Sequence, residues 1–237
     1  MENKYEIKFR ITSVELNEIE DWLKSDKLNS KKGNSFYNNW DLICKAHREN
    51  TIAIIKLENI IIGYSIWSVI EIGAIIDIFE IKPDYRKRGV GKYFFKKISD
   101  NFILNNFKVI RLFCEPKKSE IFWIKMGFRK FSYVSESIPD LSYFKPLIVI
   151  NEPKINTDSC NKLELWDLEP HLAKKTKPKW IWDIDYDNFQ PILHPCNSDW
   201  NIRLSIKEKI IKEKKVKYFS KKEIQFDYFI FIDELSE

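Results

Sequence analysis

The first 150 residues contain a series of short apolar segments whose patterns predict strands. Tyr5 to Ile11 alternates apolar and polar residues, which is typical of a half-buried strand. Thr51 to Leu57 and Ile60 to Ile72 flank Glu58-Asn59, a pair that suits a hairpin turn. Ala74 to Ile81 is a continuous β-branched and aromatic run, so it predicts a buried central strand. We therefore expect three consecutive antiparallel strands that end at Ile81.

Two segments between the first and second strands predict helices. One begins at Thr12 or Ser13, which suit a helix N-cap, and runs through Lys24. The other covers Phe36 to Arg48, and Gly33-Asn34 predicts a loop between them. A third helix is indicated further along the chain, where apolar residues recur at four-residue spacing from Val90 to Phe102.

The segment after the third helix predicts three further strands and a short helix. Val109 to Glu115 has strand composition, and Ser119 suits the cap of a short helix through Lys125. Gly127 follows that helix and is expected in the left-handed conformation. Phe128 to Glu136 and Tyr143 to Ile150 then predict the last two strands of the sheet.

A basic, glycine-containing turn joins the central strand to the third helix. Gly89 and Gly91 remove side chains where a ligand would approach the main chain, and the free N–H groups at a helix start attract anions. The cationic side chains around this turn are Arg86, Lys87, Arg88 and Lys92. A pyrophosphate or several phosphates fit such a turn better than a lone carboxylate does. The alternative is an ordinary surface turn with solvated charges.

The order of these elements resembles that of the GNAT superfamily of N-acetyltransferases over residues 4 to about 150. Two segments carry the resemblance: Arg86-x-x-Gly89-x-Gly91 preceded by Ile81-x-Pro83, and Trp123 to Phe128 with its Gly-Phe ending. The resemblance implies an α+β fold with a mixed, mostly antiparallel central sheet flanked by helices. Residues 1–150 would form this acetyltransferase domain.

The resemblance also implies how acetyl-CoA would bind. In the family the central strand splays from its neighbour at a bulge, and the pantetheine arm enters the opening. The main chain of Phe79 and Ile81 would pair with this arm. The pyrophosphate would be held by the turn residues, which are Arg86, Lys87, Arg88, Gly89, Val90, Gly91 and Lys92.

The acetyl group would then move directly from the thioester to an amine. This reaction needs a base that takes a proton from the amine and an acid that gives a proton to the departing thiolate. Carboxylates at Glu80, Asp77 and Glu71 are the candidate bases, in that order of preference. Trp123 stands where the family commonly has a tyrosine acid, and its indole cannot give up a proton. Pro116 likewise replaces a common asparagine. A CoA-binding or regulatory module with little or no transferase activity therefore remains the alternative.

Residues 151–237 predict a small α+β appendage that serves acceptor binding or oligomerisation. It holds four tryptophans, Trp166, Trp180, Trp182 and Trp200, which exclude a disordered tail. Strands are expected at Lys162 to Trp166, Lys179 to Ile184, Asn201 to Ile206 and Gln225 to Ile232. Lys207 to Tyr218 fits a helix or a strand, and for the wider run to Lys222 we favour a charged helix face over a binding patch.

The charge distribution limits the classes of ligand that this protein could bind. Net charge is +5 with a pI near 8.8, which allows an anionic ligand but falls short of a dedicated nucleic-acid binder. The C-terminal part carries 15 Lys and Arg against 16 Asp and Glu, so the basic excess lies in the first part. The lysines from Lys174 to Lys179 are best explained as a solvated loop.

The cysteines give no metal pattern. Cys44, Cys114, Cys160 and Cys196 include no CxxC pair, so we expect reduced thiols. Cys160, His171, His194 and Cys196 match no common zinc spacing, and we expect no metal.

The expected location rests on the absence of apolar targeting and membrane-spanning segments from this sequence. The N-terminus has no apolar h-region and no segment is long enough to span a membrane, which favours a cytoplasmic protein. The expected partners are acetyl-CoA and an amine acceptor, and no interaction with a membrane is expected. Whether the protein forms a homodimer is left open by the sequence. A small molecule, a protein amine and an aminoacyl-tRNA all remain open as acceptors.

Overall fold

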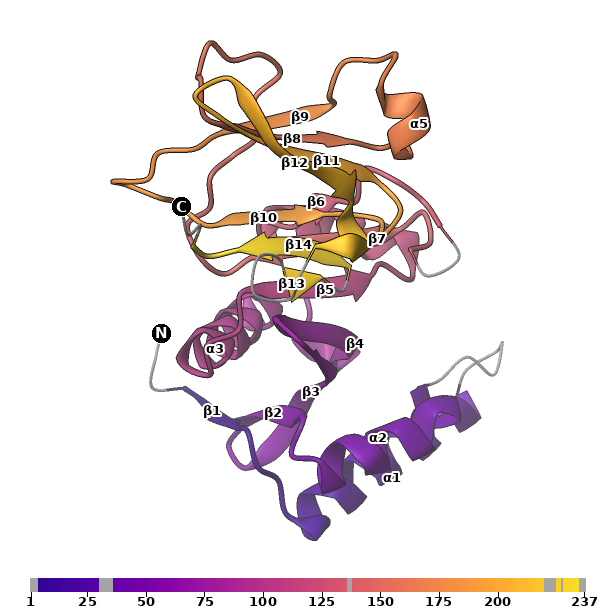
Figure 1. Cartoon of the computed structure of the whole chain (residues 1–237). Helices are drawn as coiled ribbons and strands as arrows, with labels where there is room; N and C mark the ends of the chain where they lie inside the picture. Colours follow the sequence, from indigo (N-terminus) through magenta and orange to yellow (C-terminus); the bar gives the residue numbers. More distant parts are fainter. Residues whose placement is uncertain (1–3, 30–35, 136–137, 220–224, 227, 235–237) are drawn as a thin grey trace. The chain divides into compact units, whose positions relative to one another are not determined.

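The computed structural model describes residues 4–29, 36–135, 138–219, 225–226 and 228–234 of the chain (Figure 1). The loop expected at Gly33-Asn34 lies outside these residues. The chain forms two compact units, 1–147 and 148–237.

Unit 1 is built on a seven-stranded sheet with the order β1-β2-β3-β4-β5-β7-β6. Its strands are β1 (Tyr5–Lys8), β2 (Ile52–Leu57), β3 (Ile60–Ile70), β4 (Gly73–Ile81), β5 (Val109–Phe113), β6 (Arg129–Lys130) and β7 (Ser142–Pro146). β4 and β5 pair in parallel, and the other neighbouring strands pair antiparallel. The mixed, mostly antiparallel sheet expected from the sequence is therefore confirmed.

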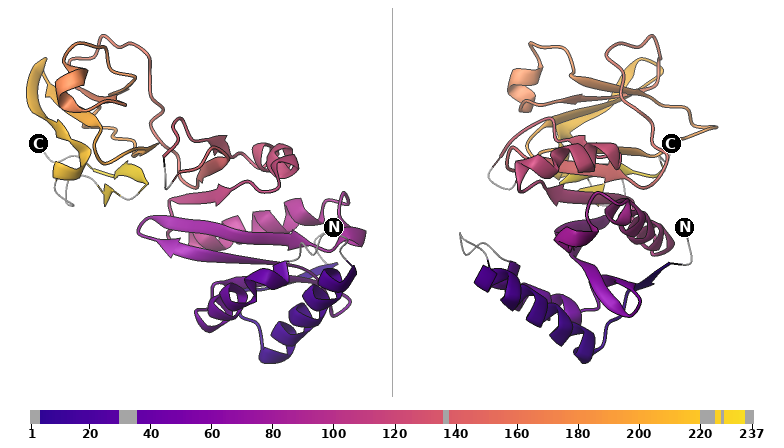
Figure 2. Two further views of the ribbon diagram at one scale, coloured as in Figure 1. Left: turned by 90° about the vertical axis from the view of Figure 1, so that its right-hand side faces the viewer. Right: turned by 180° about the vertical axis from the view of Figure 1, so that it is seen from behind.

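Helices cover both faces of this sheet (Figure 2). The longer elements are α1 (Ser13–Asn29), α2 (Trp40–Arg48), α3 (Val90–Leu104) and α4 (Glu120–Lys125), and the 3-10 turns are η1 (Phe36–Asn39), η2 (Pro83–Tyr85) and η3 (Lys117–Ser119). α3 buries Phe94, Ile98 and Phe102 against one face, as their four-residue spacing predicts. α1 and α2 bury Ile19, Trp22 and Ile43 against the other face.

β4 lies close to β5 at its first residue. A Cβ on Gly73 would stand 2.0 Å from the Val109 carbonyl oxygen, so only glycine lets the two strands pair there. This close contact fixes the start of the parallel pair, from which β4 later diverges.

Several expected strands are shorter in the structure. β1 ends at Lys8 rather than Ile11, and the described part of the expected strand from Phe128 contributes only β6. β7 ends at Pro146, a residue that cannot donate to a further ladder hydrogen bond. Gly127 adopts the expected left-handed conformation with a φ of +89°.

Unit 2 contains two small sheets in the described part of the chain. A four-stranded sheet has the order β12-β11-β8-β9, and a three-stranded sheet has the order β10-β14-β13. The strands are β8 (Lys162–Trp166), β9 (Trp180–Asp183), β10 (Ile192–Pro195), β11 (Asn201–Ile206), β12 (Lys209–Lys215), β13 (Gln225–Phe226) and β14 (Phe229–Ile232). The short helical elements are α5 (Pro170–Ala173) and η4 (Val216–Tyr218).

The sequence-based assignment of unit 2 needs three corrections. The charged helix favoured for Lys207 to Lys222 is wrong where the chain is described, because β12 is an edge strand paired with β11. Lysine is common on edge strands, where its charge discourages pairing with another chain. The segment Gln225 to Ile232 forms the pair β13 and β14 rather than one strand. The short strand β10 was not expected at all.

Candidate active site

The C-terminal half of β4 separates from β5. β4 pairs with β5 only from Gly73 to Ile76, while its pairing with β3 continues to Ile81. The β3–β4 register shifts at this point, since Ile66 faces Ile78 whereas Trp67 faces Ile76. Asp77 is the extra residue of a β-bulge, which bends the strand and interrupts its pairing. An open strand edge therefore begins at Asp77.

The main chain of Phe79 and Ile81 faces this open edge. Lys82 donates its N–H to the Ile62 carbonyl at 2.8 Å, which fixes the phase of the β3–β4 ladder. In an antiparallel ladder the backbone groups alternate in direction, so Phe79 and Ile81 turn theirs away from β3. These are the two residues that, by the family resemblance, would pair with the pantetheine arm.

The basic turn follows directly after β4. The 3-10 turn η2 reverses the chain, and Lys87 and Gly89 then take positive φ values of 59° and 82°. The first hydrogen bond at the start of α3 runs from Tyr93 N–H to the Gly89 carbonyl at 3.0 Å. The N–H groups of Val90, Gly91 and Lys92 precede that bond and form the anion-attracting end of the helix.

Three of the four cationic side chains around this helix start have no carboxylate partner among the described residues, while the fourth, Arg86, pairs with Glu80. Lys87, Arg88 and Lys92 are exposed, and none of them forms an ion pair within the described residues. A Cβ built on Gly89 would meet nothing within 4 Å, whereas one on Gly91 would touch the Phe122 ring at 3.5 Å. The turn thus leaves open space beside Gly89 and offers several cations to an anion placed there.

Glu80 lies on the open half of β4 and is bound by Arg86. The Arg86 guanidinium donates to Glu80 Oε1 and, through Nε, to the Ile81 carbonyl oxygen at 2.7 Å. Burial raises the pKa of Glu80, and the charge and hydrogen bond of Arg86 oppose that rise. A carboxylate with a raised pKa at an open strand edge has the properties of a general base.

Asp77 is the second candidate base and occupies the bulge itself. The Ser68 hydroxyl donates to Asp77 Oδ2 at 2.7 Å. Desolvation raises the pKa of Asp77 although the residue as a whole is exposed, and the Ser68 hydrogen bond and the charge of Lys45 oppose the rise. Glu71, the third candidate, lies in the turn between β3 and β4, at the opposite end of β4 from the glycines.

Trp123 occupies the aromatic core beside this site. It is 6% exposed and its ring centroid lies 5.3 Å from that of Phe79 and 5.5 Å from that of Phe95. Trp123 is therefore a packing residue, and it holds the ring of Phe79 on the α3 face of the sheet. Pro116 lies between β5 and η3, where its carbonyl accepts hydrogen bonds from the backbone and hydroxyl of Ser119.

The sequence did not single out Tyr64, which the structure brings to the site. Tyr64 on β3 faces Glu80 on β4, and it is fully buried with its ring edge-on to Trp22. Asp26 on α1 lies close enough to influence both Tyr64 and Glu80 electrostatically. Only the strand register could reveal this group, because Tyr64 lies sixteen positions before Glu80 in the sequence.

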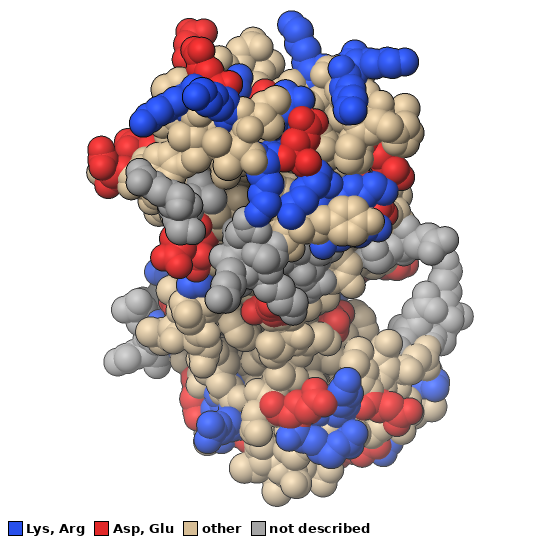
Figure 3. Space-filling model, viewed as in Figure 1, with Lys and Arg blue, Asp and Glu red and all other residues tan. Residues whose placement is uncertain are grey.

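Other candidate chemistry is less organised. Within the described residues no three His, Cys, Asp or Glu side chains lie together as a metal site. On the face shown in Figure 3, basic and acidic side chains are interspersed. Lys179, at the end of the lysine-rich loop, pairs with Asp167 at 2.6 Å.

No described helix has the length and apolar character needed to cross a membrane.

The sheet order and the flanking helices give unit 1 the fold of the GNAT N-acetyltransferases, as the resemblance implied. A GNAT acetyltransferase structure from Staphylococcus aureus superposes with a TM-score of 0.50 at 18% identity, covering 61% of this chain and 99% of that one.

Two further solved structures match with similar coverage. Ard1 from Thermoplasma volcanium matches with a TM-score of 0.48 at 17% identity over 62% of this chain and 99% of its own. The PaiA N-acetyltransferase of Thermoplasma acidophilum, solved with coenzyme A, matches with a TM-score of 0.47 at 16% identity, over 60% of this chain and 98% of its own. No protein-family model matches the sequence, and comparison with curated protein sequences gives no match.

Proposed function

We propose that unit 1 binds acetyl-CoA and transfers its acetyl group directly to an amine acceptor. The observation that carries this proposal is the juxtaposition of two features at the end of β4. The strand has an open edge at Phe79 and Ile81, and a basic helix N-terminus follows a few residues later. An extended arm with amide groups suits the edge, and a pyrophosphate suits the helix start.

The proposed chemistry uses Glu80 as the base. The amine must lose a proton to attack the thioester carbonyl carbon, and a partly buried carboxylate with a raised pKa can accept that proton. The C–S bond then breaks, and the thiolate of CoA takes a proton from solvent because Trp123 cannot supply one. Asp77, held by Ser68, is the second candidate for the base.

A second function is a CoA-binding regulatory module with little transfer activity. The placement of Trp123 favours it, since a buried core residue stands where the resemblance implies an acid. The two functions share the donor site and differ only in turnover. They are therefore separated by measuring acetyl transfer and not by measuring binding.

The test is an assay of CoA release from acetyl-CoA with a panel of amines that includes small amines, peptides and aminoacyl-tRNA. We expect release with at least one acceptor, and a fall in kcat of about 100-fold or more in Glu80→Gln. Asp77→Asn tests the second candidate: it should retain most of the activity if Glu80 is the base, and a comparable fall in this variant alone would assign the base to Asp77. Binding of acetyl-CoA without release for any acceptor would instead support the regulatory module.

A further inference from the structure

Arg86 holds the two groups of β4 that an acyl donor and an acceptor would use. Its Nε donates to the Ile81 carbonyl at 2.7 Å, and its terminal nitrogen pairs with the Glu80 carboxylate. The turn η2 makes this geometry, because it folds the chain back so that Arg86 reaches the end of its own strand. The Arg86 N–H donates to the Pro83 carbonyl at 3.1 Å and anchors the reversal.

The Ile81 carbonyl is an acceptor on the open edge of β4. It points away from β3, and it lies beyond the last residue of β4 that pairs with β5. A strand-like ligand that added itself to this edge would need that carbonyl for one of its amide donors. Arg86 therefore occupies a hydrogen-bonding position that the ligand requires.

The guanidinium of Arg86 is accessible to solvent. The Arg86 side chain is 50% exposed, whereas that of Glu80 is only 18% exposed. An exposed arginine loses little when it exchanges a carbonyl partner for water. The carboxylate that it leaves behind is more buried and would lose its strongest neutralising partner.

We propose that Arg86 is a positioning residue that competes with the pantetheine arm of the donor and releases Glu80 when the arm binds. This inference rests on the proposed function. Without a donor, Arg86 keeps Glu80 paired and the Ile81 carbonyl occupied. When the arm takes the Ile81 carbonyl, the guanidinium swings out and Glu80 becomes a stronger base. The enzyme would thus acquire its base only after the donor has bound.

Three charged groups near Glu80 influence its titration. Arg86 from the turn and Lys118 from η3 favour the charged carboxylate, while Asp26 from α1 disfavours it. Tyr64 from β3 stands opposite and stays neutral, since burial raises the pKa of its hydroxyl far above the physiological range. Loss of Arg86 from this set removes the closest positive charge. The pKa of Glu80 should therefore rise when the donor binds.

Binding of three ligands to Arg86→Met tests the competition. Acetyl-CoA and S-acetylpantetheine both carry the arm, and adenosine 3′,5′-bisphosphate carries phosphates without it. We expect the variant to bind the two arm-bearing ligands about five-fold more tightly, because no contact must be broken first. Its affinity for the bisphosphate should not change. Arg88→Met is the matched control and should weaken acetyl-CoA and the bisphosphate without tightening S-acetylpantetheine.

The pH profile gives a second readout that a purely structural role would not move. In the native protein the basic group seen in kcat/KM for the donor should have a lower pKa than the one seen in kcat. In Arg86→Met and Arg86→Gln the two values should coincide at the higher pKa. If Arg86→Met weakens acetyl-CoA and the bisphosphate alike, Arg86 is a phosphate ligand and the competition is wrong. If the native protein binds neither arm-bearing ligand, the proposed function fails as well.

Discussion

Tyr64 and Glu80 stand directly opposite each other on β3 and β4, and the buried Tyr64 hydroxyl has no hydrogen-bond partner among the described residues. A buried hydroxyl without a partner costs folding free energy. We therefore expect Tyr64→Phe to leave the free energy of unfolding unchanged or to raise it by up to about 1 kcal/mol. Urea unfolding measures the difference.

Tyr143→Phe is the matched control for that substitution. Tyr143 is equally buried, but its hydroxyl donates to Glu120 at the start of α4. Its loss should lower the free energy of unfolding by about 1 to 2 kcal/mol. Equal losses in the two variants would mean that the Tyr64 hydroxyl has a partner in solution after all.

Glu15 gives unit 1 a defined response to acid. Burial alone would raise the pKa of Glu15, but hydrogen bonds from Lys8, Thr12 and Lys56 lower it to about 2. A carboxyl whose pKa is depressed in the folded state stabilises it above the unfolded value of 4.5 and loses this contribution as pH falls toward 2. The stability of the native protein should therefore decline between these two pH values.

Glu15→Gln should show the loss at neutral pH. We expect its free energy of unfolding at pH 7 to be lower by about 2 kcal/mol, because charge-assisted hydrogen bonds are replaced by neutral ones. Urea unfolding from pH 7 to 3 should give a flatter curve for the variant than for the native protein. A parallel decline in both would assign the acid sensitivity to other carboxyls.

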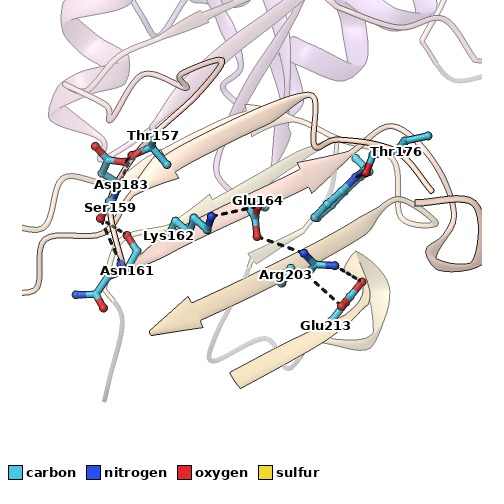
Figure 4. Close-up of polar contacts among 10 residues, drawn as sticks. Thr157, Ser159, Asn161, Lys162, Glu164, Thr176, Asp183, Arg203 and Glu213 are labelled. Atoms are coloured by element: carbon cyan, nitrogen blue, oxygen red, sulfur yellow. Dashed lines mark hydrogen bonds and ion pairs between the residues drawn. The ribbon is translucent and has the colours of Figure 1, made fainter. Parts of the chain in front are cut away.

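Arg203 ties together three strands of unit 2 (Figure 4). It makes two hydrogen bonds to Glu213, pairs with Glu164 at 3.7 Å and stacks on Trp166 at 4.8 Å. Glu164 is only 5% exposed, and its other described partner is Lys162 at 3.7 Å. We expect Arg203→Met to lower the free energy of unfolding by about 3 kcal/mol, because the buried Glu164 and the half-buried Glu213 both lose this cation.

Arg203→Lys separates charge from geometry at this position. A lysine restores one positive charge but cannot form the two parallel hydrogen bonds to Glu213. Thermal unfolding should therefore place this variant between the native protein and Arg203→Met. A variant as stable as the native protein would show that the charge alone matters.

The elements of unit 1 could be predicted because their signals are local. Glu58-Asn59 forms the expected hairpin turn with two positive φ values, and asparagine is a recognised residue for such turns. Lys207 and Glu208 also form a turn with two positive φ values, but neither residue type indicates such a turn. The lysine-rich β12 therefore looked like a helix, since only its pairing with β11 makes it a strand.

The site could be predicted only in part for the same reason. The glycine turn and the carboxylates of β4 lie within one short segment, so their proximity follows from the sequence. The contact of Arg86 with Glu80 depends on the reversal at η2, and the place of Tyr64 depends on the β3–β4 register. Neither relationship leaves a sequence pattern. Both required the three-dimensional arrangement.

If the turn after β4 holds the phosphates of acetyl-CoA, calorimetric titration of acetyl-CoA should detect the effect of a negative charge placed at Gly89. A side chain on Gly89 has open space but must adopt a φ of 82°, so Gly89→Ala measures backbone strain alone. We expect the native protein to bind, Gly89→Ala to bind within about ten-fold of it, and Gly89→Glu to show no binding, because a carboxylate would repel the phosphates. Unchanged affinity in Gly89→Glu, or no binding to the native protein, would mean that this turn does not hold the phosphates of acetyl-CoA.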